Sequence, residues 1–173
     1  GCGILILKRL SDAQKSGDKI YATIRGIGAS SDGKGKGITA PNPVGQRLAL
    51  ERAYTKAELD PLSVELFECH GTSTVVGDKI EVETLAEYLR AQSGSGTTAN
   101  IGSVKSNIGH LKSAAGSASL IKMALSIHHN KKAPSINFSA ARSDVAFDGL
   151  TVQTSVEPWR SEIRRAGVSA FGF

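Results

Sequence analysis

The stretch VELFECHGTST, residues 64–74, decides the fold, because an apolar strand pattern ends there in a glycine- and hydroxyl-rich turn. Val64–Cys69 is a strand candidate, and His70 follows it directly. Parallel sheets present reactive side chains at the carboxyl ends of their strands, and Gly71 allows a ligand to approach the backbone closely. A lone histidine is more often structural than reactive, so a second signal is needed to indicate a functional site.

That second signal is SVKSNIGH, residues 103–110, which follows another strand candidate and precedes a nearly all-apolar helix candidate. At a helix N-terminus the dipole opposes positive charge, so we expect His110 to be neutral. A neutral imidazole with a fixed tautomer is a donor suited to stabilising an oxyanion or enolate. Lys105 would be costly if buried alone, and Glu81 is its expected partner; the alternative is an exposed loop lysine.

The apolar residues alternate between strand and helix periods along the chain. We expect strands over 4–7, 19–29, 64–69, 99–104, 150–155 and 167–171, and helices over 45–59, 78–90 and 111–127. Alternating strands and helices predict an α/β fold with a mostly parallel sheet covered on its faces. His128 and His129 end the last helix, where the dipole favours them, so capping is expected rather than catalysis.

Composition excludes several classes of protein. The chain has 173 residues, with 21 Lys and Arg against 16 Asp and Glu and a net charge of +5. This length is about one domain, and no run reaches the ~18 apolar residues of a membrane span. Two cysteines, Cys2 and Cys69, exclude a disulfide framework and a cysteine-rich zinc site. We therefore expect no metal, no membrane insertion and a reducing, cytoplasmic location.

Two features bear on nucleic acids and nucleotides. The basic residues gather at Lys34/Lys36, Lys131/Lys132 and Arg160/Arg164/Arg165. No aromatic platform is interleaved with them, so solvated charge or docking of an acidic protein is expected rather than nucleic-acid binding.

Residues 28–35 nearly match the phosphate-binding loop G-x-x-x-x-G-K-[ST], but they end in Gly35, and Pro41 and Pro43 follow where a helix should begin. Nucleotide binding is therefore not expected.

Both chain ends are apolar, with GCGILIL at 1–7 and SAFGF at 169–173. Natural termini are usually polar and frayed. We therefore expect the chain to be a piece of a longer protein.

Three motifs in order carry a resemblance: HGTST at 70–74, VKSNIGHLKSAAG at 104–116 and AGVSAFGF at 166–173. Together they resemble the β-ketoacyl synthases, the ketosynthase domains of fatty-acid and polyketide synthases, which have the thiolase-like fold. GCGILILKRLSDA at 1–13 resembles the last strand region of the first half of that fold, so residues 14–173 are expected to be the C-terminal half of the duplicated domain. The loop and helix around 30–54 favour iterative type I synthases, of the enediyne or polyunsaturated-fatty-acid type.

The resemblance implies roles for individual residues. His70 and His110 match the family's two catalytic histidines, which bind and decarboxylate the malonyl thioester and stabilise the enolate. Lys105 matches the lysine near the second histidine, and Glu81 matches its acidic partner.

The resemblance also implies residues that hold and admit the substrate. Thr72 and Thr74 match the hydroxyls that hold the phosphopantetheine arm, and Phe171 and Phe173 match the gating phenylalanines. No cofactor is expected to be bound by the domain itself, since substrates arrive on the 4'-phosphopantetheine arm of an acyl carrier protein. The implied partners are that carrier, the remaining half of the domain and a second copy in a homodimer.

One part of the family's machinery is absent from the sequence. The family needs a nucleophilic cysteine on a strand-to-helix turn, and neither Cys2 nor Cys69 lies at such a turn. Both are expected to be inert core thiols, and the fragment alone is expected to be inactive. The alternative is a non-catalytic partner protein of the chain-length-factor type, but such proteins typically lose the two histidines.

Overall fold

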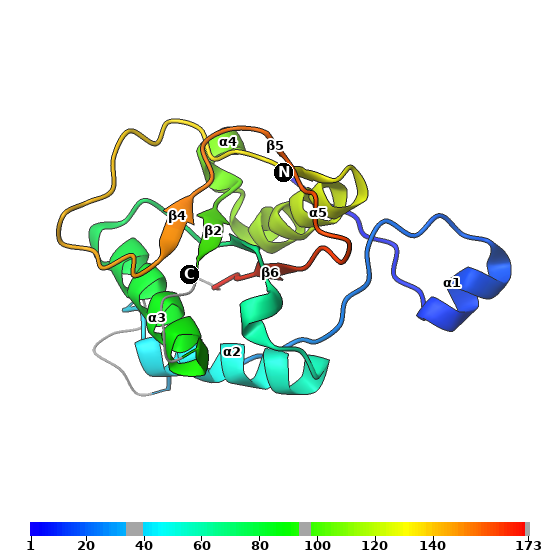
Figure 1. Ribbon diagram of the computed structural model, residues 1–173, viewed down its shortest axis with the longest axis horizontal. Coiled ribbons are helices and arrows are strands. Elements are labelled where there is room, and N and C mark those ends of the chain that lie inside the picture. The colour runs from blue at the N-terminus through cyan, green and yellow to red at the C-terminus, as the bar shows by residue number, and fades with distance from the viewer. Residues whose placement is uncertain (34–39, 94–97, 172–173) are drawn as a thin grey trace.

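The structure, a computed structural model, describes residues 1–33, 40–93 and 98–171. Its centre is a four-stranded sheet in the order β4-β2-β1-β6, in which all neighbouring strands are parallel (Figure 1). The strands are β1 (Leu66–Glu68), β2 (Ala99–Gly102), β4 (Leu150–Val152) and β6 (Ala166–Val168). Each overlaps a predicted strand, so the α/β class with a mostly parallel sheet is confirmed.

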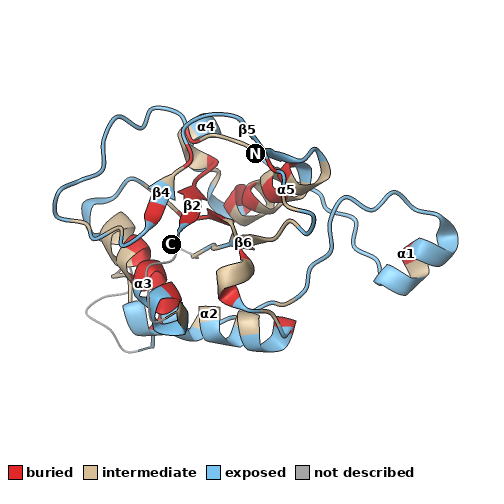
Figure 2. Ribbon diagram, viewed as in Figure 1, coloured by how far each residue is buried: buried red, intermediate tan, exposed pale blue. Residues whose placement is uncertain are grey.

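Helices cover both faces of this sheet, because successive side chains of a strand point to opposite sides. Phe67 of β1 belongs to a core cluster with α2 (Pro43–Ala57) and α3 (Val75–Ser93). Its neighbour Leu66 packs instead with Met123 of α5 (Ala115–His128). Figure 2 shows buried residues concentrated on β2, α3 and α5. The α-β-α layering expected from the sequence is therefore present.

The three predicted helices are confirmed with shifted ends. α2 begins two residues early because the Asn42 side chain accepts a hydrogen bond from the Val44 N–H at 3.0 Å and Pro43 occupies the first turn. The shorter elements are α1 (Leu10–Ser16), the 3-10 turns Pro61–Ser63 and Lys112–Ala114, α4 (Lys105–Ile108), and an antiparallel pair of β3 (Lys131–Lys132) with β5 (Glu157–Pro158). Among the described helices, none is long and apolar enough to cross a membrane.

Two segments expected to be strands, 4–7 and 19–29, pair with no strand among the described residues, so both predictions are wrong. Ile4 and Ile6 are 85% and 94% exposed. Apolar alternation shows which residues favour a strand, but a strand forms only where a neighbour supplies hydrogen-bond partners. In the second segment Gly28 lies against α2, where an added Cβ would be 2.0 Å from a backbone carbonyl oxygen. That segment packs on a helix instead of joining the sheet.

Candidate active site

His70 lies in a turn that leaves the carboxyl end of β1 and is held from two sides. The buried Glu81 carboxylate, on α3, accepts hydrogen bonds from the N–H groups of His70 and Gly71 at 2.7 and 2.9 Å. The Lys105 ammonium, on α4, donates to the His70 carbonyl oxygen. Gly71 has a φ of 46°, and an added Cβ would be 2.7 Å from the Ser103 side chain. Glycine is therefore required here by a close approach between the segments that follow two strands.

The predicted pairing of Lys105 with Glu81 is corrected by this geometry. No ion pair joins the two side chains within the described residues, because each bonds a different side of the same turn. Burial lowers the pKa of Lys105, and the negative charges of Glu81 and Glu68 oppose that effect. Burial raises the pKa of Glu81 to about 7, although the two N–H groups it accepts favour its charged form. The two residues therefore hold the turn together without touching each other.

The His70 ring is buried, with 6% of the residue exposed, and one of its nitrogens is unpaired. Its Nδ1 accepts a hydrogen bond from the Phe171 N–H at 3.3 Å, so the proton of the neutral ring is on Nε2. Nε2 is buried and has no hydrogen-bond partner among the described residues. Burial, followed by the positive charge of Lys105 and then by His110, lowers the pKa of His70 to about 4. At neutral pH His70 is therefore an uncharged ring with a free donor.

The His110 ring lies next to His70 but is exposed. The ring centroids are 5.7 Å apart and the planes make an angle of 87°. His110 Nδ1 accepts a hydrogen bond from the Lys112 N–H at 3.0 Å, so its Nε2 also carries the proton in the neutral state. Desolvation, followed by the charges of Lys105 and Lys112, lowers the pKa of His110. The sequence predicts that each histidine follows a strand, and in the structure those strands, β1 and β2, are neighbours in the sheet.

The position of His110 relative to α5 differs from the expectation. The helix begins at Ala115, and a 3-10 turn precedes it, so His110 is not in the first helical turn. The causes that lower its pKa are desolvation and the two neighbouring ammonium groups of Lys105 and Lys112.

The expected substrate-holding residues lie at the start of α3. The Thr72 and Thr74 hydroxyl oxygens are 3.2 Å apart, so the two side chains point to the same side. Phe171 lies beside His70, with ring centroids 5.0 Å apart. Phe173 lies outside the described residues, as do Lys34, Lys36 and Gly35 of the basic and glycine-rich stretches.

The two cysteines have different environments. Cys69 is buried, and burial together with nearby carboxylates raises the pKa of its thiol well above the usual value, which makes it an unreactive thiol. Cys2 is exposed, so the expectation that both are core thiols is wrong for Cys2. The reason is that the segment around Cys2 does not form a strand in the sheet.

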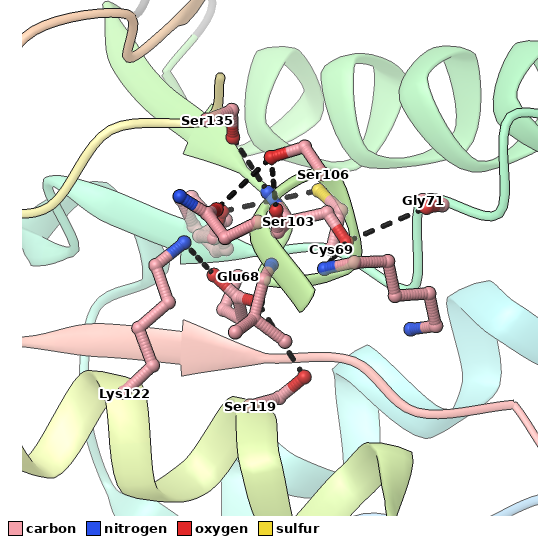
Figure 3. Close-up of polar contacts among 12 residues, drawn as sticks. Glu68, Cys69, Gly71, Ser103, Ser106, Ser119, Lys122 and Ser135 are labelled. Carbon is pink, nitrogen blue, oxygen red and sulfur yellow. Dashed lines mark hydrogen bonds and ion pairs between the residues drawn. The ribbon is translucent and has the colours of Figure 1, made fainter. Parts of the chain in front are cut away.

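Sequence reasoning did not single out Glu68 and Lys122, which form an ion pair of 2.6 Å (Figure 3). The signal was present, because Glu68 is a charged residue inside a buried strand and Lys122 is a charged residue in a nearly all-apolar helix. Charged residues are almost never fully buried unless they are paired. Within the described residues, no group of three or more His, Cys, Asp or Glu side chains could hold a metal ion.

The chain is similar in sequence to known condensing enzymes. The family model "Beta-ketoacyl synthase, C-terminal domain" matches residues 21–139. The highly reducing polyketide synthase Preu1 of Preussia isomera is 40% identical over 176 residues, which are 100% of this chain and 7% of the relative. The naringenin synthase of Pestalotiopsis fici is 39% identical over 179 residues, covering 99% of this chain and 7% of the relative. The chain thus spans a small part of these proteins.

Solved structures agree with the sequence comparison. The ketosynthase from module 6 of the bacillaene synthase of Bacillus subtilis 168 superposes with a TM-score of 0.90 and 39% identity, covering 95% of this chain and 30% of that chain. The PfaC keto synthase–chain length factor has a TM-score of 0.88 and 38% identity, covering 96% of this chain and 18% of that chain. The thiolase-like fold is therefore confirmed, and the chain belongs to the β-ketoacyl synthase family, in which it corresponds to the C-terminal domain.

Proposed function

We propose that the protein containing this chain catalyses decarboxylative Claisen condensation of a malonyl thioester with an enzyme-bound acyl thioester. One observation carries the proposal: the buried Nε2 of His70 has no partner among the described residues and lies beside His110. A buried donor without a partner is costly, and a developing enolate oxygen is a partner of the right chemistry.

In the proposed reaction the bond between the malonyl α-carbon and its carboxylate breaks, and CO2 leaves. The electron pair remains as an enolate, whose oxygen accepts hydrogen bonds from the Nε2–H groups of His70 and His110. The enolate carbon then attacks the acyl thioester carbonyl, a carbon–carbon bond forms, and the thiolate leaves. Burial lowers the pKa of His70 to about 4, so its ring is an uncharged donor at neutral pH. Desolvation and the nearby ammonium groups lower the pKa of His110 as well, which favours the uncharged ring there. Lys105 and Glu81 hold the turn that presents His70.

The proposal also assigns roles to the residues around His70 and His110 and to the rest of the protein. Thr72 and Thr74 would hold the 4'-phosphopantetheine arm of an acyl carrier protein, and Phe171 and Phe173 would gate access. The nucleophilic cysteine would belong to the remaining half of a cytoplasmic, homodimeric ketosynthase, in which residues 14–173 form the C-terminal half and 1–13 the end of the other. An iterative type I synthase remains our prediction for the subfamily.

The test measures CO2 release from malonyl-pantetheine by the intact ketosynthase. We expect His70→Ala and His110→Ala each to lower the rate by about 10²–10³-fold, since each removes a donor to the enolate. His128→Ala and His129→Ala are matched controls at the end of α5 and should retain the rate. Undiminished decarboxylation in both active-site variants would overturn the proposal.

The second candidate is a non-catalytic partner of the chain-length-factor type. The likeness to the PfaC keto synthase–chain length factor supports this candidate. It predicts no decarboxylation by the wild-type protein. Retention of both histidines in contact favours the catalytic candidate.

A further inference from the structure

Glu68 is a buried carboxylate that the proposed chemistry does not use, two residues before His70 in the chain. Its side chain is 0% exposed. One oxygen accepts from the Lys122 ammonium at 2.6 Å. The other accepts from the Val104 N–H at 2.5 Å and from the Ser119 hydroxyl at 3.5 Å. Figure 3 shows Lys122 and Ser119 reaching toward Glu68 from the α5 side.

The partners of this carboxylate lie on both flanks of the loop that carries His110. Val104 is the N-cap residue of α4, which comes before that loop. Ser119 and Lys122 belong to α5, which comes after it. One carboxylate therefore connects both ends of the His110 segment to the strand that leads into His70.

The His110 ring itself has little other support. It is exposed, and the hydrogen bond from the Lys112 N–H comes from within its own loop. The distance of 5.7 Å between the two imidazole rings therefore depends on where α4 and α5 are held relative to β1.

We propose that Glu68 is a positioning residue, which through Val104, Ser119 and Lys122 sets the place of the His110 loop relative to His70. The expected effect of Glu68 on the rate rests on the proposed function, whereas its expected effect on the position of the His110 loop does not. A displacement of about 1 Å in a reacting arrangement can lower a rate by about 10²-fold.

The test uses three variants of the intact ketosynthase: Glu68→Gln, Lys122→Met and the double variant. Each single variant leaves one buried charge unpaired and should lower the thermal unfolding midpoint. The double variant removes both charges at similar volume, so its midpoint should recover, as neutral replacements of buried ion pairs often do. The decarboxylation rate should stay at least about 10-fold low in all three, because each variant loses the Glu68–Lys122 ion pair that ties β1 to α5.

The matched control is Glu65→Gln. Glu65 pairs with Lys132 at 3.5 Å, near the opposite end of β1 from His70. This change removes a Lys–Glu pair, partly exposed at Glu65, from the same strand region and leaves the contacts of the His110 segment in place. The rate should remain within about twofold of wild type.

Two readouts separate this inference from the proposed function. A wild-type protein that releases no CO2 contradicts the proposed function, and hydrogen exchange of residues 105–114 then still tests positioning. We expect faster exchange of that segment in the double variant than in wild type or Glu65→Gln. Recovery of the rate together with stability in the double variant, or unchanged exchange, would show that Glu68 is merely structural and overturn the inference.

Discussion

The two histidine loops leave neighbouring parallel strands, yet the chain holds them differently. His70 is 6% exposed, its backbone N–H is bound by a buried carboxylate from Glu81, and its carbonyl oxygen accepts from Lys105. His110 is exposed, and its ring accepts one hydrogen bond, from the Lys112 N–H two residues later. The first loop is preorganised by long-range contacts, whereas the second is held through its flanks.

Despite this difference, the same two causes lower the pKa of both imidazoles. Burial is the main cause of the lowered pKa of His70, and Lys105 is the second. Desolvation is also the first cause of the lowered pKa of His110, and the same ammonium is the second. Lys105 therefore links the two loops electrostatically, while Glu68 links them mechanically in our proposal.

The largest expected effect tests how tightly the His70 loop is packed against Ser103. Gly71→Ala places a Cβ 2.7 Å from the Ser103 side chain at a φ of 46°, whereas Gly17→Ala, at a φ of 67° after α1, meets no atom within 4 Å. Strain alone costs about 1–3 kcal/mol, and overpacking adds about 1–3 kcal/mol at Gly71. Thermal unfolding should show a clearly lower midpoint for the Gly71 variant. Equal midpoints would mean that the His70 loop is no more tightly packed than the exposed end of α1.

The next effect concerns the Glu81 carboxylate, which accepts the two backbone hydrogen bonds of the His70 turn. Glu81→Gln leaves one oxygen for two N–H groups, so one of those at His70 and Gly71 loses its acceptor. An unsatisfied buried donor costs about 1–3 kcal/mol, and amide exchange in residues 70–74 should accelerate by about 10–100-fold. Glu87→Gln, at an exposed position of the same helix, is the control. Unchanged exchange would remove Glu81 from the positioning of His70.

A smaller effect concerns the pH dependence that the loops share. Lys105→Met removes a positive charge that disfavours the protonated imidazoles, so the pKa of His70 should rise above its value of about 4. Burial, the larger cause, remains, so the pKa should stay below 6.5. The acid limb of the pH profile for decarboxylation should therefore move to higher pH. Lys131→Met, at an exposed position of β3, should leave it in place, and an unmoved limb in the Lys105 variant would contradict the electrostatic link.

The smallest effect concerns the hydroxyls beside the His70 loop. Thr72→Val or Thr74→Val removes one hydrogen-bonding group, worth about 0.5–1.5 kcal/mol. We expect the KM for malonyl-pantetheine to rise about 3–10-fold with little change in kcat. Thr151→Val, at an exposed position of β4, is the control. A change in kcat alone would mean that these hydroxyls do not hold the pantetheine arm.

Much of the fold and part of the site followed from local pattern. The strands that overlap β1 and β2 are short apolar runs bounded by turn residues, and α3 has Asp78 in its first turn and Arg90 in its last. The same rules failed at 4–7 and 19–29, where the pattern suits a strand but the described chain supplies no partner strand. Pairing is a property of two segments, so one segment's periodicity does not predict it.

The sequence by itself determined the family, the α/β class and the placing of His70 and His110 after parallel strands, because motifs and periodicity are local properties of the chain. Only the tertiary structure decided which side chains the charged residues bond. Glu81 bonds the backbone instead of Lys105, and Glu68 pairs with Lys122, which is 54 residues away in the sequence. The physical reason is that a buried charge takes whichever partner the packed layers bring within hydrogen-bond distance, and that distance depends on the whole fold.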